Sequence, residues 1–399
     1  MKKNKPVNDI VVLSTADWDN PFWTNKQHVT LELAKRGHRV LYIESLGLRR
    51  PGINKRDLSR IFRRVLKAIK APRQVRDNIW VWSPISIPFN RYSIVRKFNK
   101  FMLSSALKFW CWKLGMREKT LWTYNPLTTR FLTLGHFSNV IYHCVDEIKA
   151  QPGMPVDILQ EAEEELVRKA DIVFVTSLTL LKSRKQWSDN VYYHSNVADY
   201  NHFSLALNEE TRIPEDLKNI PEPRIGFIGA ISGYKVNFAL LEKIAEAHPE
   251  WSIVMIGTVG EGDPNTDATR LTRHKNIHLI GPRDYKLLPN YLKGFSATLL
   301  PNNINEYTAS MFPMKFFEYL AAGKTVVSVD LASLADFKDY ARIGKNDEEF
   351  IARLEAVIAG DSISVEQCQE LAREYTYQAR TEKMFKIIDE KCNESSNRP

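Results

Sequence analysis

The chain has 399 residues, enough for two or three domains of ordinary size with large buried cores. Hydrophobic residues make up 44% and charged residues 26%, a balance that excludes a disordered chain and a fibrous repeat. Four cysteines without a CxxC pair exclude a disulfide-rich module and predict free thiols and no structural zinc. The first apolar run, residues 10–13, is too short for a signal peptide or a spanning helix, so we expect a cytoplasmic protein.

Short apolar strands alternate with helices over the first half of the chain. Residues 10–14 and 38–44 predict two strands, and residues 27–36 between them predict a helix that ends at Gly37. Further strands are expected at residues 79–83, 120–123, 140–144 and 172–175. This alternation predicts a parallel α/β sheet with helices on both faces.

Positive charge is concentrated between the second and third of these strands. Residues 49–77 contain eleven basic and two acidic side chains, so this segment accounts for the whole formal net charge of +9. Six apolar residues in it recur at helical spacing: Leu58, Ile61, Phe62, Val65, Leu66 and Ile69. The other face of the predicted helix is basic. Such a helix can lie in a bilayer interface with its cations on anionic head groups.

A second basic segment, at residues 91–113, is rich in Phe and Trp. Aromatic rings beside cations are typical of the membrane interface. We therefore predict that residues 49–113 face an anionic membrane surface, through Arg60, Phe62, Arg63, Arg64, Lys67 and Trp110. The alternative is that the apolar stripe packs on the protein's own core. Nucleic acid is not expected as a partner, because phosphates give the apolar stripe nothing to contact.

A polar, proline-bearing stretch at residues 208–223 predicts a linker, after which the alternation resumes. Strands are expected at RIGFIGA, WSIVMIG, IHLIG, SATLLP and TVVSV. Helices are expected at residues 238–247, 284–293 and 313–322, the last with Pro313 at its first helical position. The sequence therefore predicts two doubly wound α/β units in tandem.

The loop after the first strand of the second unit, GFIGAISGYK, brings small residues and a cation together. Gly229, Ser232 and Gly233 allow close approach of the backbone, and Lys235 can reach an anion. The glycines do not have the GxGxxG spacing of dinucleotide binding, which disfavours a nicotinamide dehydrogenase. An ordinary tight turn is the alternative.

The helix predicted at Pro313 offers its amino-terminal dipole to an anion such as a pyrophosphate. Lys315 stands in its first turn, where a cation opposes the dipole unless an anion is bound. Glu318 follows three residues later and can accept the hydroxyl hydrogens of a ribose. The alternative is a surface ion pair between Lys315 and Glu318.

Four segments together resemble the GT-B glycosyltransferases, specifically the family-4-like enzymes of bacterial teichuronic acid and exopolysaccharide biosynthesis. They are PMKFFEYLAAGKTVVS, GFIGAISGYK, NIHLIGPRDYKLLPNYLKGFSATLLP and LSTADWDNPFWTNKQHVTLELAKRGHRVLYIE. The resemblance implies an α/β GT-B fold, in which two Rossmann-like, doubly wound domains face each other across a cleft. It also implies that the first domain binds the acceptor and the second a nucleotide-sugar.

The resemblance identifies Glu318 with the glutamate that holds the donor ribose, and Lys235 with a lysine on the donor diphosphate. Ala230 stands where many relatives have arginine, so that phosphate contact is expected either to be missing or to come from Lys315 or Arg283. A second departure concerns the sugar. The full set of expected donor-binding residues is Gly229, Ser232, Lys235, Arg283, Tyr307, Ser310, Lys315 and Glu318.

This second departure lies in the loop before the helix predicted at Pro313. Ser310 stands where the family has the first glutamate of an E-x7-E pair, which normally touches the donor sugar. Residues from Tyr307 to Ser310 are expected to take over through backbone amides and hydroxyls.

On the acceptor side, the strand VIYHC is followed by Asp146 and Glu147, which we expect to be catalytic. If the enzyme inverts, Asp146 is the general base; if it retains configuration, as family-4-like enzymes do, Asp146 orients the donor and the leaving phosphate takes the proton. A capping aspartate is the structural alternative. Asp17 and Trp18 are expected to line the acceptor side, with Trp18 stacking on a sugar ring.

We therefore divide the chain into an acceptor-binding domain (1–207), a linker (208–223), a nucleotide-sugar-binding domain (224–375), and a carboxyl-terminal helix and tail (376–399) that can cross back to the first domain. The resemblance implies a retaining hexosyltransferase without metal or cofactor, peripheral on the inner face of the cell membrane, with a lipid-linked or polysaccharide acceptor of the cell envelope. The alternatives are a nucleotide-sugar 2-epimerase and a non-catalytic, sugar-nucleotide-binding scaffold.

Overall fold

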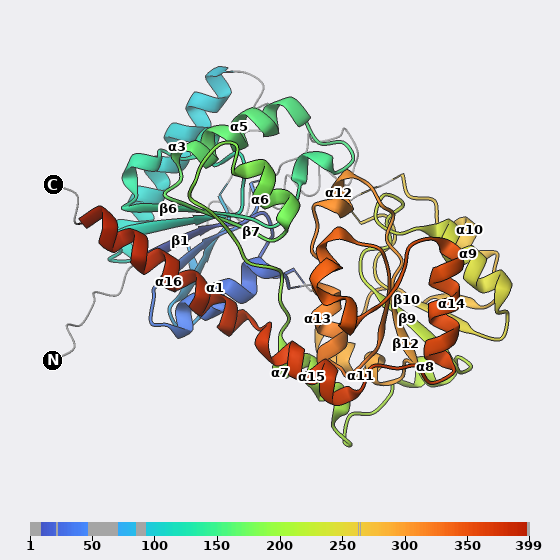
Figure 1. Ribbon diagram of the computed structural model, residues 1–399. Coiled ribbons are helices and arrows are strands. Elements are labelled where there is room, and N and C mark those ends of the chain that lie inside the picture. Colours follow the sequence, from blue (N-terminus) through green and yellow to red (C-terminus); the bar gives the residue numbers. More distant parts are fainter. Residues whose placement is uncertain are drawn as a thin grey trace. The chain divides into compact units, whose positions relative to one another are not determined.

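The computed structural model describes residues 9–20, 23–46, 71–84, 93–261, 263 and 265–396. The chain forms two compact units, one of Met1–His194 with Thr381–Pro399 and the other of Ser195–Arg380. Each unit is built on its own parallel or nearly parallel sheet (Figure 1). The predicted pair of doubly wound α/β units is confirmed.

The first unit contains an eight-stranded sheet in the order β3-β4-β2-β1-β5-β6-β7-β8. Every neighbouring pair is parallel except β3 and β4, which are antiparallel at one edge. The strands are β1 (Asp9–Leu13), β2 (Val40–Ile43), β3 (Arg73–Arg76), β4 (Ile79–Trp82), β5 (Lys119–Thr123), β6 (Asn139–Cys144), β7 (Ile172–Val175) and β8 (Val191–Tyr193). β1, β2 and β7 are buried along their whole length, as expected for strands covered on both faces.

Helices cover both faces of this sheet (Figure 1). They are α1 (Asn25–Lys35), α3 (Ser93–Lys113), α4 (Thr128–Phe131), α5 (Val156–Lys169), α6 (Leu178–Arg184) and the greater part of α16 (Tyr377–Ser396). On one face Leu107, Leu166 and Leu180 from α3, α5 and α6 join a single core cluster. α16 packs against the other side of the unit, where the Phe385 ring stacks on His38 at 5.2 Å between centroids.

The second unit contains a six-stranded, all-parallel sheet in the order β11-β10-β9-β12-β13-β14. Its strands are β9 (Arg224–Ile228), β10 (Ser252–Ile256), β11 (Ile277–Leu279), β12 (Ala297–Leu300), β13 (Val326–Val329) and β14 (Arg342–Gly344). Its helices are α7 (Tyr200–Phe203), α8 (Glu215–Lys218), α9 (Phe238–Ala247), α10 (Thr269–Thr272), α11 (Leu288–Lys293), α12 (Glu306–Ala309), α13 (Met314–Ala321), α14 (Asp347–Ile358) and α15 (Val365–Glu374). One apolar cluster lies under α11, α13 and α15, and a second under α9 and α14.

The two units divide at His194 and Ser195, a different position from the linker expected at residues 208–223. Those residues lie within the second unit, where Leu217 and Ile220 of this stretch are buried in the core. The composition of residues 208–223 is mostly polar, which is why it predicts a linker. The burial of Leu217 and Ile220 is nevertheless enough to anchor this stretch to the second unit. Among the described residues, none of the helices combines the length and apolar character needed to cross a bilayer.

His248 follows α9 and is held by two carboxylates. Its Nδ1 lies 3.0 Å from Glu250 Oε1 and its Nε2 lies 2.8 Å from Glu355 Oε1. Burial alone would lower the pKa of His248, but the hydrogen bonds to Glu250 and Glu355 outweigh it, so the pKa is raised. A raised pKa in the folded state means that the protonated imidazole stabilises the fold at low pH, and that this contribution disappears as the pH rises through the folded-state pKa.

His248→Gln is therefore expected to lower the free energy of unfolding more at about pH 5.5 than at about pH 9. Both carboxylates are exposed to solvent, so the difference should stay below about 1 kcal/mol. Urea unfolding at the two pH values measures it, and Glu355→Gln should remove part of the same difference. Equal losses for His248→Gln at both pH values would contradict the ion pairs.

Candidate functional site

Loops from three strands meet at the carboxyl edge of the second sheet. The Gly229 amide, just after β9, donates to Ile256 O of β10 at 2.9 Å. Gly257, with φ +153°, lies so close to this loop that a Cβ atom there would be 1.8 Å from Gly229 O. Glycine at 257 is thus required for the loop after β9 to lie against β10, and it was not predicted as part of the site.

A run of asparagines after β12 fixes the glycine-rich loop. Asn303 Nδ2 donates to Gly233 O at 2.8 Å, and Asn305 Nδ2 donates to Tyr234 O at 2.7 Å. The Asn303 amide donates to Lys235 O at 2.9 Å. These asparagines were not predicted, although a polar N-N-I-N run directly after a buried strand is a signal for such a role.

Lys235 and Tyr307, both predicted donor-binding residues, are brought together. The Lys235 Nζ lies 5.3 Å from the ring centroid of Tyr307 and 5.3 Å from that of Tyr234. The two rings meet edge to face at 5.3 Å. Aromatic faces attract a cation without neutralising it. The ammonium is thus held beside two tyrosine rings at the carboxyl edge of the sheet.

Ser232 and Ser310 have structural contacts. The Ser232 hydroxyl donates to Glu261 O, and the next amide, of Gly233, donates to Thr266 Oγ1 at 3.0 Å. Ser310 is buried and directly follows α12, where its amide donates to Tyr307 O at 3.1 Å. Ser232 therefore closes the glycine-rich loop by a side-chain bond, and Ser310 ends the short helix that carries Tyr307.

α13 begins one residue later than predicted. Pro313 has φ −72° and ψ 110°, which is extended backbone, so it is the N-cap and not the first helical residue. The Lys315 Nζ lies 2.7 Å from Glu318 Oε2, so the i, i+3 pair given as the alternative is formed. This pair is not a surface pair, because the Glu318 side chain is only 6% exposed and that of Lys315 25%.

The buried carboxylate of Glu318 also acts on Tyr285, which lies in the loop region after β11. Burial raises the pKa of Tyr285, and the negative charge of Glu318 raises it further. The Tyr285 ring stacks on His202 of α7 at 4.3 Å between centroids. Glu318 is thus placed beside the loop after β11 and not in open solvent.

Arg283, in that same loop, is engaged within the fold. Its Nη2 lies 2.7 Å from Asp216 Oδ2 of α8, and its Nε donates to the Tyr291 hydroxyl at 2.7 Å. Burial alone would raise the pKa of Asp216, but Arg283 and Tyr291 outweigh it and lower it. Lys315 and Arg283, the two candidates for the phosphate contact missing at Ala230, are therefore both paired with carboxylates in this structure.

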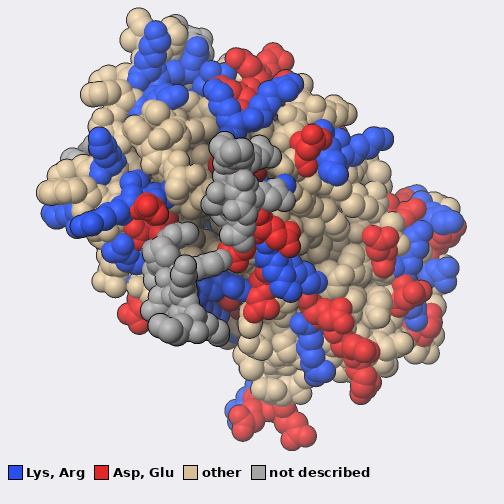
Figure 2. Space-filling model, turned by 60° about the vertical axis from the view of Figure 1, so that its left-hand side comes forward, with Lys and Arg blue, Asp and Glu red and all other residues tan. Residues whose placement is uncertain are grey.

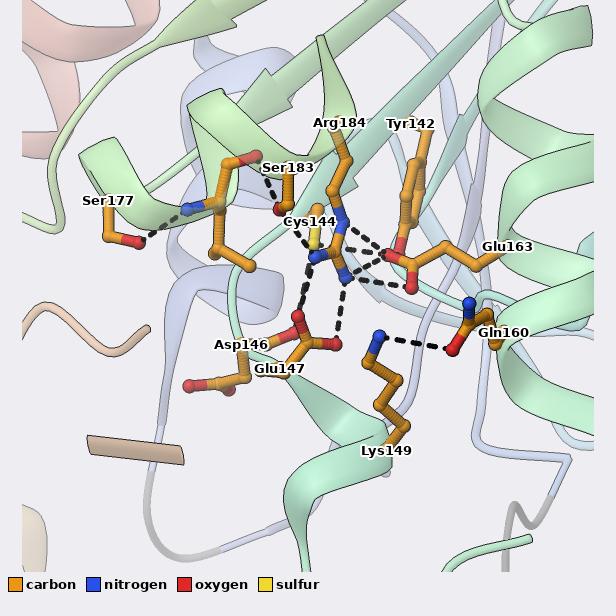
Figure 3. Close-up of polar contacts among 11 residues, drawn as sticks. Tyr142, Cys144, Asp146, Glu147, Lys149, Gln160, Glu163, Ser177, Ser183 and Arg184 are labelled. Carbon is orange, nitrogen blue, oxygen red and sulfur yellow. Dashed lines mark hydrogen bonds and ion pairs between the residues drawn. The ribbon is translucent and has the colours of Figure 1, made fainter. Parts of the chain in front are cut away.

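In the first unit, Asp146 and Glu147 follow β6 but point in different directions (Figure 3). Glu147 turns toward Arg184 of α6, which binds it through two bonds of 2.5 and 2.9 Å. The Asp146 carboxylate points away from Arg184 and is half-buried. This geometry corrects the expectation for Glu147, because a buried carboxylate held by two guanidinium bonds serves the structure. Asp146 remains the candidate at this strand end.

Arg184 also binds Glu163 of α5, so one cation holds two carboxylates. Its Nη2 lies 2.7 Å from Glu163 Oε1, and the Tyr142 hydroxyl donates to the same oxygen at 2.8 Å. The Arg184 side chain is only 1% exposed. Burial alone would lower the pKa of Arg184, but the carboxylates of Glu147 and Glu163 outweigh it and raise it. Burial raises the pKa of Cys144, which therefore stays a neutral thiol beside the cluster.

Trp18 lies in a packing position. It is 5% exposed, and its ring meets Trp23 and Tyr42 at 5.3 and 5.2 Å between centroids. Stacking on a sugar, as expected from the sequence, would require this ring to be uncovered. Asp17, next to it, accepts at its backbone oxygen a 3.0 Å bond from Gln27 Nε2. Asp19 pairs with Arg73 at 2.5 Å, and the part of the chain that the structure describes contains no group of His, Cys, Asp and Glu arranged to hold a metal.

The predicted membrane contacts are only partly covered by the structure. Arg60, Phe62, Arg63, Arg64 and Lys67 lie outside the described residues. Trp110 belongs to α3, where it is half-buried and packs against the core of the first unit. The Lys113 Nζ lies over its ring at 5.5 Å.

Removing the buried guanidinium should destabilise the protein strongly. Arg184→Met leaves Glu147 and Glu163 buried without their cation, and we expect a loss of about 3–5 kcal/mol in the free energy of unfolding. Arg168→Met is a matched control, since Arg168 forms an exposed pair with Glu164 and its loss should cost less than about 1 kcal/mol. Denaturant unfolding compares the two, and similar losses would contradict the role of the cluster.

The chain resembles known proteins both in sequence and in structure. Residues 222–367 match the family model "Glycosyl transferases group 1". TuaH of Bacillus subtilis (strain 168), assigned as a glycosyltransferase of teichuronic acid biosynthesis, is 27% identical over 273 residues, which are 63% of this chain and 67% of TuaH.

Solved structures share the fold. Sucrose-phosphate synthase from Thermosynechococcus elongatus has a TM-score of 0.67 at 13% identity, over 96% of this chain and 98% of that one. HepE of Anabaena, solved with UDP and glucose, has a TM-score of 0.66 at 12% identity, over 95% and 99%. Residues 222–367 thus match the glycosyl transferases group 1 family, and the chain has the fold of GT-B glycosyltransferases.

Proposed function

We propose that this glycosyltransferase moves a hexose from a nucleotide-diphospho-sugar to a lipid-linked or polysaccharide acceptor of the cell envelope, at the cytoplasmic face of the membrane. The second unit binds the donor, and the first unit binds the acceptor. The relative TuaH, named for teichuronic acid biosynthesis, supports an envelope polysaccharide as the product. The solved structures named above are of a synthase and of HepE, so they lend no support to the epimerase alternative.

The observation that carries this proposal is the position of Lys235. Its ammonium is fixed by two tyrosine rings on a glycine-rich loop, at the edge of a parallel sheet where ligands of such folds bind. A fixed cation at this position suits a diphosphate. In this proposal Glu318 of α13 accepts the hydroxyl hydrogens of the ribose, and Lys315, which pairs with it at 2.7 Å, turns to a phosphate oxygen.

The proposed reaction retains configuration and uses neither metal nor cofactor. The bond between the anomeric carbon and the donor phosphate oxygen breaks, the acceptor oxygen bonds to that carbon, and the acceptor's hydroxyl proton passes to the leaving phosphate. Lys235 stabilises the negative charge that develops on the diphosphate as the bond breaks. Asp146 orients the sugar through its hydroxyl groups.

A panel of UDP, GDP, ADP and CMP tests the donor site by the shift in melting temperature. We expect one nucleotide, UDP, to stand out, because HepE was solved with it. At 100 times its dissociation constant it should add about 2.7 kcal/mol to stability. Lys235→Met and Glu318→Gln should weaken its binding roughly tenfold or more, since each removes a charge-assisted hydrogen bond.

The matched controls are Lys243→Met and Glu370→Gln, which remove exposed charges of the same unit. They should bind the nucleotide like the unmodified chain. Equal binding by Lys235→Met and by its control would remove Lys235 from the donor site. No shift with any nucleotide, and no nucleoside diphosphate released from any sugar donor, would favour the non-catalytic scaffold.

Asp146→Asn tests the candidate on the acceptor unit. The amide keeps the shape of the side chain and leaves the Arg184 cluster intact, so we expect turnover to fall by roughly 100-fold or more while nucleotide binding is unchanged. Release of nucleoside diphosphate from the donor measures turnover. Asp157→Asn, at an exposed position of α5, is the control. Full activity of Asp146→Asn would assign this aspartate to capping of the loop after β6.

A further inference from the structure

α3 has apolar residues on two faces. Leu103, Leu107 and Cys111 are buried in the core of the first unit. A second set of large apolar side chains points outward along the helix: Ile94 (80% exposed), Phe98 (51%), Phe101 (71%), Phe109 (49%) and Trp112 (73%). These five recur at i, i+4, i+7, i+15 and i+18, a spacing that places them on one side of a helix. We call this set the outer face of α3.

The outer face is a patch and not a chance scatter. Single exposed apolar side chains are normal on a protein surface. The other large apolar residues that are exposed in the described chain lie singly or in twos on separate elements, as with Val156 and Leu178. Five lie on one side of one helix, three of them Phe and one Trp, and such apolar strips mark interaction sites.

Along α3 itself, the charged residues that border this strip are all cations. α3 contains no acidic residue, while Lys97, Lys108 and Lys113 are exposed along it. Figure 2, which brings the left-hand side of Figure 1 forward, shows blue Lys and Arg side chains among tan residues over the first unit. Lysine is depleted at protein interfaces, whereas Trp and Phe flanked by Lys are characteristic of helices that lie in a bilayer interface.

We propose that the outer face of α3 is a membrane-docking surface, which inserts its aromatic side chains between the lipids of an anionic bilayer while its lysines bind the head groups. The proposal rests on the membrane location given under the proposed function and identifies the surface responsible. The flexible stems of Lys97 and Lys108 reach from the strip to the head groups. The inner face of α3 is anchored in the core, so docking requires no rearrangement of the helix.

Sedimentation of the full chain with vesicles tests this surface. Vesicles of phosphatidylcholine with phosphatidylglycerol should bind the chain at least tenfold more strongly than vesicles of phosphatidylcholine alone, and added salt should weaken the binding. Phe101→Ser with Trp112→Ser should weaken binding at least tenfold. Val156→Ser with Leu178→Ser, which removes exposed apolar side chains from the same unit, is the matched control and should bind normally.

A second pair, Lys97→Gln with Lys108→Gln, keeps the aromatic residues and should reduce both the binding and its salt dependence. Both pairs should keep the melting temperature of the unmodified chain and its shift with UDP. A retained nucleotide shift with lost vesicle binding separates this surface from the donor site. Normal vesicle binding by both pairs would overturn the proposal, as would absence of binding by the unmodified chain. A concentration-dependent dimer that Phe101→Ser with Trp112→Ser abolishes would instead assign the surface to a second copy.

Discussion

Parallel pairing of buried strands is the constraint on which both units depend. Strands such as β1 and β10 are covered on both faces, so their side chains are apolar and leave no room for chemistry within the sheet. Polar groups can be reached only where the strands end. Since parallel strands all end at the same edge, loops that are far apart in the sequence are brought together there. The contacts of Gly229 with Gly257 and of Gly233 with Asn303 are a direct result.

Buried charged groups inside each unit are likewise held by polar partners. Arg184 would destabilise the first unit if it were buried alone, but it is bound by two carboxylates and keeps the chain after β6 in one conformation. In the second unit, burial and the nearby Lys293 lower the pKa of Lys324 to about 8, and its ammonium donates to two backbone oxygens. The Lys315 and Glu318 pair differs from both, because the Lys315 side chain is 25% exposed while that of Glu318 is buried.

The surface of the first unit differs from its interior, because large apolar side chains are exposed on α3. α3 has enough apolar residues to cover the sheet on one side and still present a strip of rings outward. A helix that served only the core would carry polar residues on that side. The surplus of aromatic and basic residues on α3 therefore adds an interaction to the unit that its own fold does not require.

The sequence by itself determined the two α/β units, since the apolar runs at residues 10–13 of β1, 172–175 of β7 and 253–256 of β10 are typical of buried strands. It missed β3, β8 and β14, which lie at sheet edges and are short or polar. It also placed Lys235, Tyr307 and Glu318 as candidates from local motifs. Only the tertiary structure decided which charges are already paired, because Arg184 reaches Glu147 across 37 residues and Arg283 reaches Asp216 across 67. Such pairing depends on which side chains the folded sheet brings within hydrogen-bonding distance. The spacing of residues along the chain does not predict it.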